Sequence, residues 1–246
     1  MSLITGHGGT AAAVAGALVL SSLALAGCGV MNEVNKIGHT VAGNKATIDT
    51  FTTKLHSGAA TPFEVKYVTT GSAPATIVYA VQPPKGLLFK DSASSGGTGL
   101  PGTEIVVNGS GEYVCAPPGS RHARWTCQKL GKASAAVQNK IFGFYTALHW
   151  VTFLRTFALA AGFAGDKVST STTTVNGFTM NCLDFRASGI PGTSIVCSTA
   201  QGILGYVKVA GDPTSFQIKS YTTSPAAALF QLPAGAKITS LKAGQK

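Results

Sequence analysis

Residues 104–115 read EIVVNGSGEYVC, two short strand-like runs separated by Asn108-Gly109. An Asn-Gly pair between such runs is the strongest short-range signal for a β-hairpin, because both residues tolerate the positive φ angles of tight hairpin turns. The same signal, Asn176-Gly177, separates residues 168–175 from residues 178–185. Since hairpins join antiparallel neighbours, these two segments predict an antiparallel sheet.

Further strands are expected on both sides of these hairpins. Phe63, Val65 and Tyr67 alternate with charged residues, which is the period-two pattern of a half-buried strand. With the hairpins included, about eleven strands are predicted, at residues 63–67, 77–81, 87–89, 104–107, 112–115, 125–130, 168–175, 178–185, 194–198, 203–209 and 215–222.

Two helical regions interrupt the strands. Apolar residues before residue 56 recur at helical spacing, but Gly38 and Gly43 weaken the first half, so a firm helix is predicted over 44–56. Residues 133–163 are expected to form a central helical block. Runs of strands with segregated helices are typical of the α+β class, and we predict that class.

The apolar run 141–165 contains one charge, Arg155, and its hydropathy is compatible with a membrane span. A charge in the middle of a span costs ~3 kcal/mol. A crossing here would also place two of the cysteines described below in a reducing compartment. We therefore expect one or two buried helices. His149 within the run is expected to be a buried, hydrogen-bonded histidine rather than a ligand.

The chain of 246 residues is 45% hydrophobic and 11% charged, with a net charge of +10. Average proteins carry ~25% charged residues. The apolar content is ample for a core, which excludes a disordered charged tail. The composition also excludes collagen and coiled coils.

Four cysteines lie in the body of the chain as two local pairs, Cys115 with Cys127 and Cys182 with Cys197. Four cysteines allow three pairings. The local one is favoured, because each pair flanks a turn-rich segment between strands. The alternative, a four-thiolate zinc site, usually has Cys-x2-Cys spacing, which is absent. Disulfides indicate an exported protein.

The first 27 residues carry no Lys, Arg, Asp or Glu and include an apolar stretch, 11–26. That stretch is shorter than the ~20 residues of a membrane span and suits a signal peptide. It ends in Leu25-Ala26-Gly27-Cys28, which resembles the lipobox of bacterial lipoproteins. The alternative is an ordinary secretory signal with an incidental cysteine.

The lipobox resemblance implies cleavage after residue 27 and a diacylglyceryl thioether on Cys28, which carries two acyl chains such as palmitate. Two chains anchor a protein stably to a membrane. The expected organisation is a signal peptide (1–27), a lipidated tether (28–43) and an α+β domain (44–246). The expected location is extracytoplasmic, at the cell membrane through the lipid anchor.

The order helix, strands, helical block, strands resembles the LolA and LppX/LprG group of lipoprotein and lipid carriers. Three stretches carry the resemblance: residues 79–89 around Pro83-Pro84-Lys85, residues 105–109 followed by Tyr113, and residues 230–236, FQLPAGA. It covers about residues 40–240. It implies a strongly curved antiparallel half-barrel whose concave face is covered by the N-terminal helix and the central helical block.

Catalytic signatures are missing. The sequence has no Cys-x-x-Cys-His, His-Glu-x-x-His, Gly-x-Ser-x-Gly or Walker A motif. The glycines of 97–102 match a dinucleotide pattern but lack its strand-to-helix context. We therefore expect no catalytic residue, metal or cofactor, and an enzyme is the third hypothesis.

One group of residues is basic and surrounds Trp125. Its members are Arg121, His122, Arg124, Lys129 and Lys132. They form either a solvated hairpin face or a contact with anionic headgroups or acidic wall polymers. Nucleic acid is not an expected partner for an exported, membrane-tethered chain.

A second group is aromatic and lies in the helical block. Its members are Phe142, Tyr145, Trp150, Phe153 and Phe157. They form either a filled core or the lining of an acyl-chain cavity. The favoured hypothesis is a lipid-anchored carrier of a lipid or acylated ligand. The alternative is an envelope interaction or sensor module with a closed core, contacting a protein partner or an acidic wall polymer.

Overall fold

The computed structural model describes residues 29–71, 74–84, 86–91, 102–119, 123–130, 143–164, 168–186, 190–213 and 215–240. They form one large sheet and two α-helices, which confirms the α+β class. The strands are β1 (Phe63–Thr69), β2 (Thr76–Gln82), β3 (Gly86–Asp91), β4 (Glu104–Asn108), β5 (Gly111–Ala116), β6 (Thr126–Lys129), β7 (Val168–Val175), β8 (Phe178–Phe185), β9 (Ser194–Ser198), β10 (Leu204–Lys208), β11 (Ser215–Thr222) and β12 (Lys237–Ser240).

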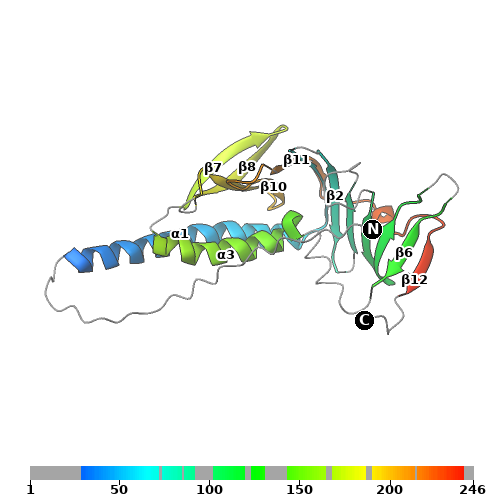
Figure 1. Ribbon diagram of the computed structural model, residues 1–246, viewed down its shortest axis with the longest axis horizontal. Helices are drawn as coiled ribbons and strands as arrows, with labels where there is room; N and C mark the ends of the chain where they lie inside the picture. Colours follow the sequence, from blue (N-terminus) through cyan, green and yellow to red (C-terminus); the bar gives the residue numbers. More distant parts are fainter. Residues whose placement is uncertain are drawn as a thin grey trace, which may run out of the picture.

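The sheet has twelve strands in the order β12-β6-β5-β4-β3-β2-β1-β11-β10-β9-β8-β7 and is open, with β12 and β7 at its ends (Figure 1). Each of the eleven predicted strands is present. β12 was not predicted, and it pairs with β6 in parallel, with Ile238 opposite Cys127. Every other pairing is antiparallel, as the hairpin signals predicted.

The two Asn-Gly pairs both lie at hairpins but act differently. Asn176 and Gly177 have φ angles of 52° and 83°, the left-handed pair that a type I′ turn requires. Asn108 instead pairs with Gly111 as the last strand residue, and its side-chain oxygen accepts the N–H of Ser110 at 2.9 Å. An asparagine that caps a turn in this way stabilises it without itself adopting a positive φ.

Two helices lie side by side along one face of the sheet (Figure 1). The first, α1, spans Gly29–Ala59, so the helix also includes residues predicted to be the tether. Its buried residues Ile48, Phe51 and Leu55 recur at helical spacing. The second, α3 (Ala147–Ala164), follows a 3-10 turn, η1 (Gly143–Tyr145). No helix in the described residues is both long and apolar enough to cross a membrane.

The C-terminal end of α1 packs directly on the turn between β9 and β10. A Cβ added to Gly58 would lie 2.3 Å from the carbonyl oxygen of Gly202, and Gly202 itself has a φ of 78°. Side chains at either position would therefore push the helix away from the sheet. The two glycines permit the contact that sets where α1 ends.

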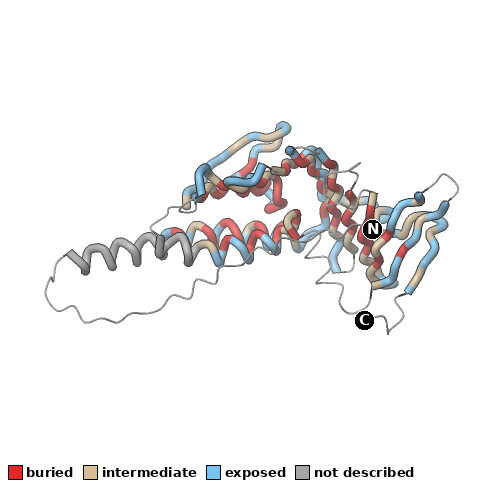
Figure 2. The backbone as a smooth tube through the Cα atoms, viewed as in Figure 1, coloured by how far each residue is buried: buried red, intermediate tan, exposed pale blue. Residues whose placement is uncertain are grey.

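The sheet is covered on parts of both faces. Figure 2 shows buried residues where the helices face the sheet, and these form the main core. A smaller cluster lies on the opposite face, where Phe230 of the 3-10 turn η2 (Ala227–Phe230) packs with Ala80, Leu88 and Val106. Asn108 Nδ2 donates to the Phe230 carbonyl oxygen at 3.0 Å. These contacts hold the C-terminal segment against β2–β4. The segment contains residues 230–236, one of the stretches that carry the family resemblance, and it continues into β12, which pairs with β6.

Both predicted disulfides are present, which confirms the local pairing. Cys115–Cys127 joins β5 to β6 and Cys182–Cys197 joins β8 to β9, with Cα–Cα distances of 4.0 and 3.9 Å. In each bond the two cysteines are direct register partners. The bonds therefore lock neighbouring strands, and the turn-rich segments lie between them.

Replacing Phe230 by Ala should lower the free energy of unfolding by about 3–5 kcal/mol, because the ring is the centre of the small core on the second face. Urea unfolding followed by circular dichroism measures the loss. The control is Ile238→Ala on β12, whose side chain is 54% exposed. Equal losses for the two variants would contradict this account of the C-terminal segment.

Candidate functional site

The space between the helices and the sheet contains a continuous series of aromatic rings. Successive centroids lie 4.9–5.7 Å apart, within the range of favourable ring contacts. We call this series the aromatic core; its members are Phe63, Tyr67, Tyr79, Phe89, Phe144, Tyr145, Trp150 and Phe216. Strands from both halves of the sheet contribute to it.

Two predicted cavity residues, Tyr145 and Trp150, belong to this core. Trp150 is 2% exposed, and its Nε1 donates to the Phe144 carbonyl oxygen at 2.7 Å. Burial, with a smaller effect of the Asp91 charge, raises the pKa of Tyr145 to about 12. Tyr67 donates from its hydroxyl to the Leu204 carbonyl oxygen at 2.9 Å. Tyr145 and Trp150 therefore fill the interior around them.

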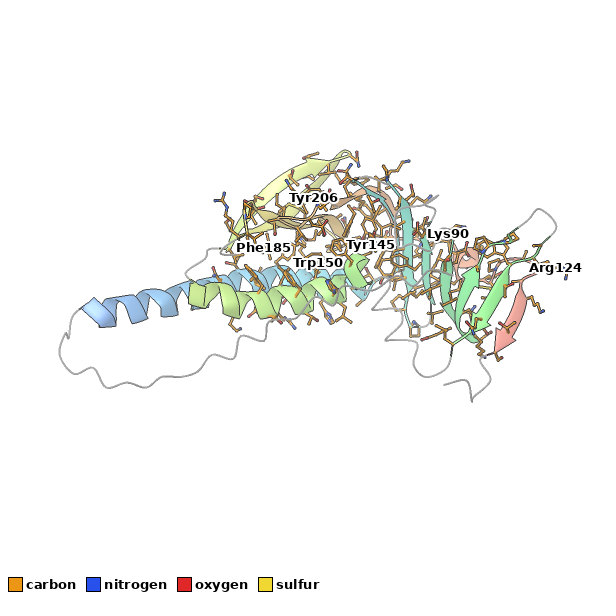
Figure 3. The ribbon with its side chains drawn as sticks, in the orientation of Figure 1. Lys90, Arg124, Tyr145, Trp150, Phe185 and Tyr206 are labelled. Carbon is orange, nitrogen blue, oxygen red and sulfur yellow. A yellow bond between two sulfur atoms is a disulfide. The ribbon has the colours of Figure 1, made fainter. Side chains whose placement is uncertain are left out.

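The predicted residues Phe153 and Phe157 lie instead where this core reaches the surface. Phe153 is 39% exposed, and Phe157 is half-buried. Both contact Phe185 of β8, at centroid distances of 6.0 and 4.7 Å. Phe153 also contacts Trp150 at 5.4 Å. We call Phe153, Phe157 and Phe185 the aromatic margin; in Figure 3, Phe185 lies on the α3 side of the sheet.

A hollow of about 500 Å³ runs along the solvent side of α3, between Leu148, His149, Thr152 and Phe153. Leu148 is 59% exposed. The prediction that His149 is buried was wrong, because its side chain is exposed. Successive residues of a helix are rotated by about 100°, so when Trp150 faces the core, His149 before it is turned toward solvent. Partial desolvation lowers the pKa of His149.

The described residues of the basic group predicted around Trp125 lie away from the aromatic margin. Arg124 and Lys129 are exposed on and beside β6, and the pairing of β12 brings Lys237 next to Thr126. We call Arg124, Lys129 and Lys237 the basic edge. Figure 3 shows Arg124 at one end of the molecule, far from Phe185, because β6 and β8 lie near opposite ends of the sheet order. The basic edge therefore does not flank the aromatic margin.

Several predicted site residues lie outside the described residues. They are Cys28, Arg121, His122, Lys132 and Phe142. Within the described part of the chain, no group of three or more His, Cys, Asp or Glu side chains could hold a metal ion.

Sequence reasoning missed the strand residues of both aromatic groups. Phe89, Phe185 and Phe216 were read as strand interiors and not as site residues. Their alternation indicates that each points to one face of the sheet. Alternation does not reveal which helix such a face meets. The contacts of Phe185 with Phe153 and Phe157 of α3 appear only in the tertiary structure.

No protein-family model matches this chain, and no curated protein matches its sequence. Among solved structures, it is similar to the crystal structure of an uncharacterized conserved protein from Thermus thermophilus, with a TM-score of 0.46 and 6% identity over 79% of this chain and 99% of the other. It is also similar to PNGF-II, solved in space group C2, with a TM-score of 0.31 and 11% identity over 75% of this chain and 31% of the other. Overlaps this loose say nothing about what the protein does.

Trp150→Ala should lower the free energy of unfolding by about 3–5 kcal/mol, because it removes a fully buried ring and its hydrogen bond. Phe153→Ala should cost clearly less, because that ring is partly in water already. Paired urea titrations of the two variants test the ordering. A larger cost at Phe153 would show that the margin, not the aromatic core, is the packed centre.

Proposed function

We propose that this protein is a lipid-anchored, extracytoplasmic binding protein of the cell envelope that takes a lipid or acylated ligand and is not an enzyme. The observation that carries the proposal is the aromatic margin. Phe153, Phe157 and Phe185 form an apolar surface that begins in the core at Trp150 and ends in solvent. An acyl chain laid against these rings would bury further apolar area, at ~25 cal/mol per Å².

In this proposal the sheet acts as an open half-barrel. The helical block, α3 with its preceding turn, covers the concave face together with α1. The margin lies between α3 and β8, so a small outward movement of α3 would admit a chain between helix and sheet. Support comes from the way α3 is held: it packs closely on α1, and Phe153 and Phe157 meet β8 through ring contacts with Phe185. Ring contacts can reform around an inserted chain.

The proposed anchor lies at Cys28, next to the first residue of α1, Gly29. At 1.5 Å per residue a 31-residue helix is about 46 Å long. It would connect the lipidated end to Leu55 in the core by one rigid element. Two acyl chains would suffice for stable membrane attachment, and the two disulfides support an oxidising, extracytoplasmic location.

A second candidate is the closed-core interaction module. It is favoured by the aromatic core, because Tyr145 and Trp150 leave no room for a ligand at their own positions. In that case the basic edge would be the working surface. Lys129 and Lys237 project from opposite faces of the sheet at this end, and together with Arg124 they would attract an acidic wall polymer or an acidic partner surface to the edge.

The lipid proposal predicts bound lipid in the full chain purified from membranes. Native mass spectrometry should show non-covalent adducts, and Phe153→Trp or Phe157→Trp should reduce their occupancy by crowding the margin. Phe178→Trp is the matched control, because Phe178 lies on β8 and contacts Tyr221 rather than α3. Repeated absence of adducts, or equal losses in all three variants, would sink the lipid proposal.

The closed-core module predicts a different result at the basic edge. Replacing Lys129 and Lys237 together by Ser should weaken binding to a soluble polyanion such as polyglutamate, and the wild-type affinity should fall as salt rises. Lys45→Ser on α1, where the lysine already pairs with Asp49, serves as the control. Binding that is indifferent to both salt and the edge lysines would exclude this surface.

A further inference from the structure

The second face of β7–β10 carries a hollow that neither proposal uses. Phe185 points toward α3, so by strand alternation Cys182 and Asp184 point to the opposite face. A hollow of about 810 Å³ lies there, with walls from β7, β8, β9 and β10. In Figure 3, Tyr206 of β10 lies farther from the helices than Phe185 does.

Strand register shows how the hollow is built. Directly opposed residues share a face, and one row across the four strands runs Ser171, Cys182, Cys197 and Tyr206. The next row begins Ser169, Asp184 and Ile195. The disulfide thus forms part of the floor of the hollow and holds β8 to β9. The hydroxyls of β7 lie on one side of the disulfide, and the Tyr206 ring of β10 lies on the other.

The polar groups of the hollow suit a ligand rich in hydroxyls. Asp184 is half-buried, and an ionised carboxylate only accepts hydrogen bonds. Arg186 is oriented by its Nε, which donates to Thr193 Oγ1 at 3.0 Å. Its terminal N–H groups extend the set of donors. Ser169 and Ser171 can donate or accept. Partial burial raises the pKa of Tyr206, so its hydroxyl stays protonated.

The solvent-facing side of an antiparallel sheet is ordinarily polar, so polarity alone would mean little. Here the polar groups surround a hollow whose floor is held by the Cys182–Cys197 disulfide and whose wall includes the half-buried ring of Tyr206. Nearly half of the lining is polar, which suits a lipid tail less well than the aromatic margin does. Asp184 and Arg186 give the lining one charge of each sign, and the exposed Lys208 lies beside Ile195 at the end of the second row; this mixture of charges favours neither a polyanion nor a polycation. A polyhydroxylated ring matches the aromatic wall and the polar lining together. Its apolar face can lie on the Tyr206 ring, and its hydroxyls can hydrogen-bond to the polar side chains of the lining.

We propose that the hollow over β7–β10 is a binding site for a neutral saccharide. The sugar would lie with one face on the Tyr206 ring and exchange hydrogen bonds with Asp184, Arg186 and the β7 hydroxyls. The anchor at Cys28, Phe153 and Phe157 take no part, and Phe185 of the aromatic margin only borders the hollow. The site therefore stands or falls independently of lipid binding.

The test uses the full chain in a detergent without a sugar headgroup, titrated calorimetrically with soluble tetrasaccharides of glucose, N-acetylglucosamine, galactose and mannose. At least one should bind, and Tyr206→Ala and Asp184→Asn should each weaken that binding about tenfold or more. Tyr206→Phe keeps the ring and should retain most of the affinity.

The matched controls are Tyr221→Ala on β11 and Asp49→Asn on α1, which lie outside the hollow and should leave binding unchanged. Thermal unfolding of each variant verifies folding; if Tyr206→Ala unfolds, Asp184→Asn decides the result. The proposal is overturned if none of the four tetrasaccharides binds the folded wild-type protein. It is equally overturned if the hollow variants bind as wild type does, or if the controls weaken binding as much as the hollow variants.

Discussion

The pairing of β1 with β11 is the contact on which the rest of the structure depends. These strands are about 150 residues apart in the chain, yet they join an N-terminal and a C-terminal set of strands into one sheet. Tyr67 of β1 and Phe216 of β11 meet at this junction, with ring centroids 4.9 Å apart. The junction also matters for the helices, because α1 precedes β1 in the chain but packs against the C-terminal strands, at β7 and at the β9–β10 turn.

Once the sheet is continuous, its inner face has to be covered, and α1 and α3 do so unequally. α1 packs its apolar residues close to the strands and approaches the β9–β10 turn through Gly58. α3 contacts α1 extensively, buries Val151 and Leu154 in the main core, and contacts β8 through the rings of Phe157 and Phe185. This leaves a filled core around Trp150 and a partly exposed margin around Phe153. The apolar ligand that we propose would therefore lie at the margin and not at the centre.

The face of the sheet that points away from α1 and α3 also has a covered region and an open region. Over β2–β4 it is covered by the C-terminal segment, with Phe230 held by Asn108. Over β7–β10 nothing comparable packs on the described strands, and a polar hollow takes its place. Three of the basic residues, Arg124, Lys129 and Lys237, lie at the edge that β6 and β12 form at the far end of the sheet.

The sequence by itself determined the local features: eleven strands, both hairpins, the α+β class and the two disulfides. These depend on alternation, turn residues and short separations, which are visible within a few residues. Tertiary structure alone decided that β12 pairs in parallel with a strand more than a hundred residues earlier, and that His149 faces solvent. It also decided that Trp150 fills the core while Phe153 reaches the surface. Which neighbours a side chain meets depends on pairings between distant segments, and no local pattern encodes that choice.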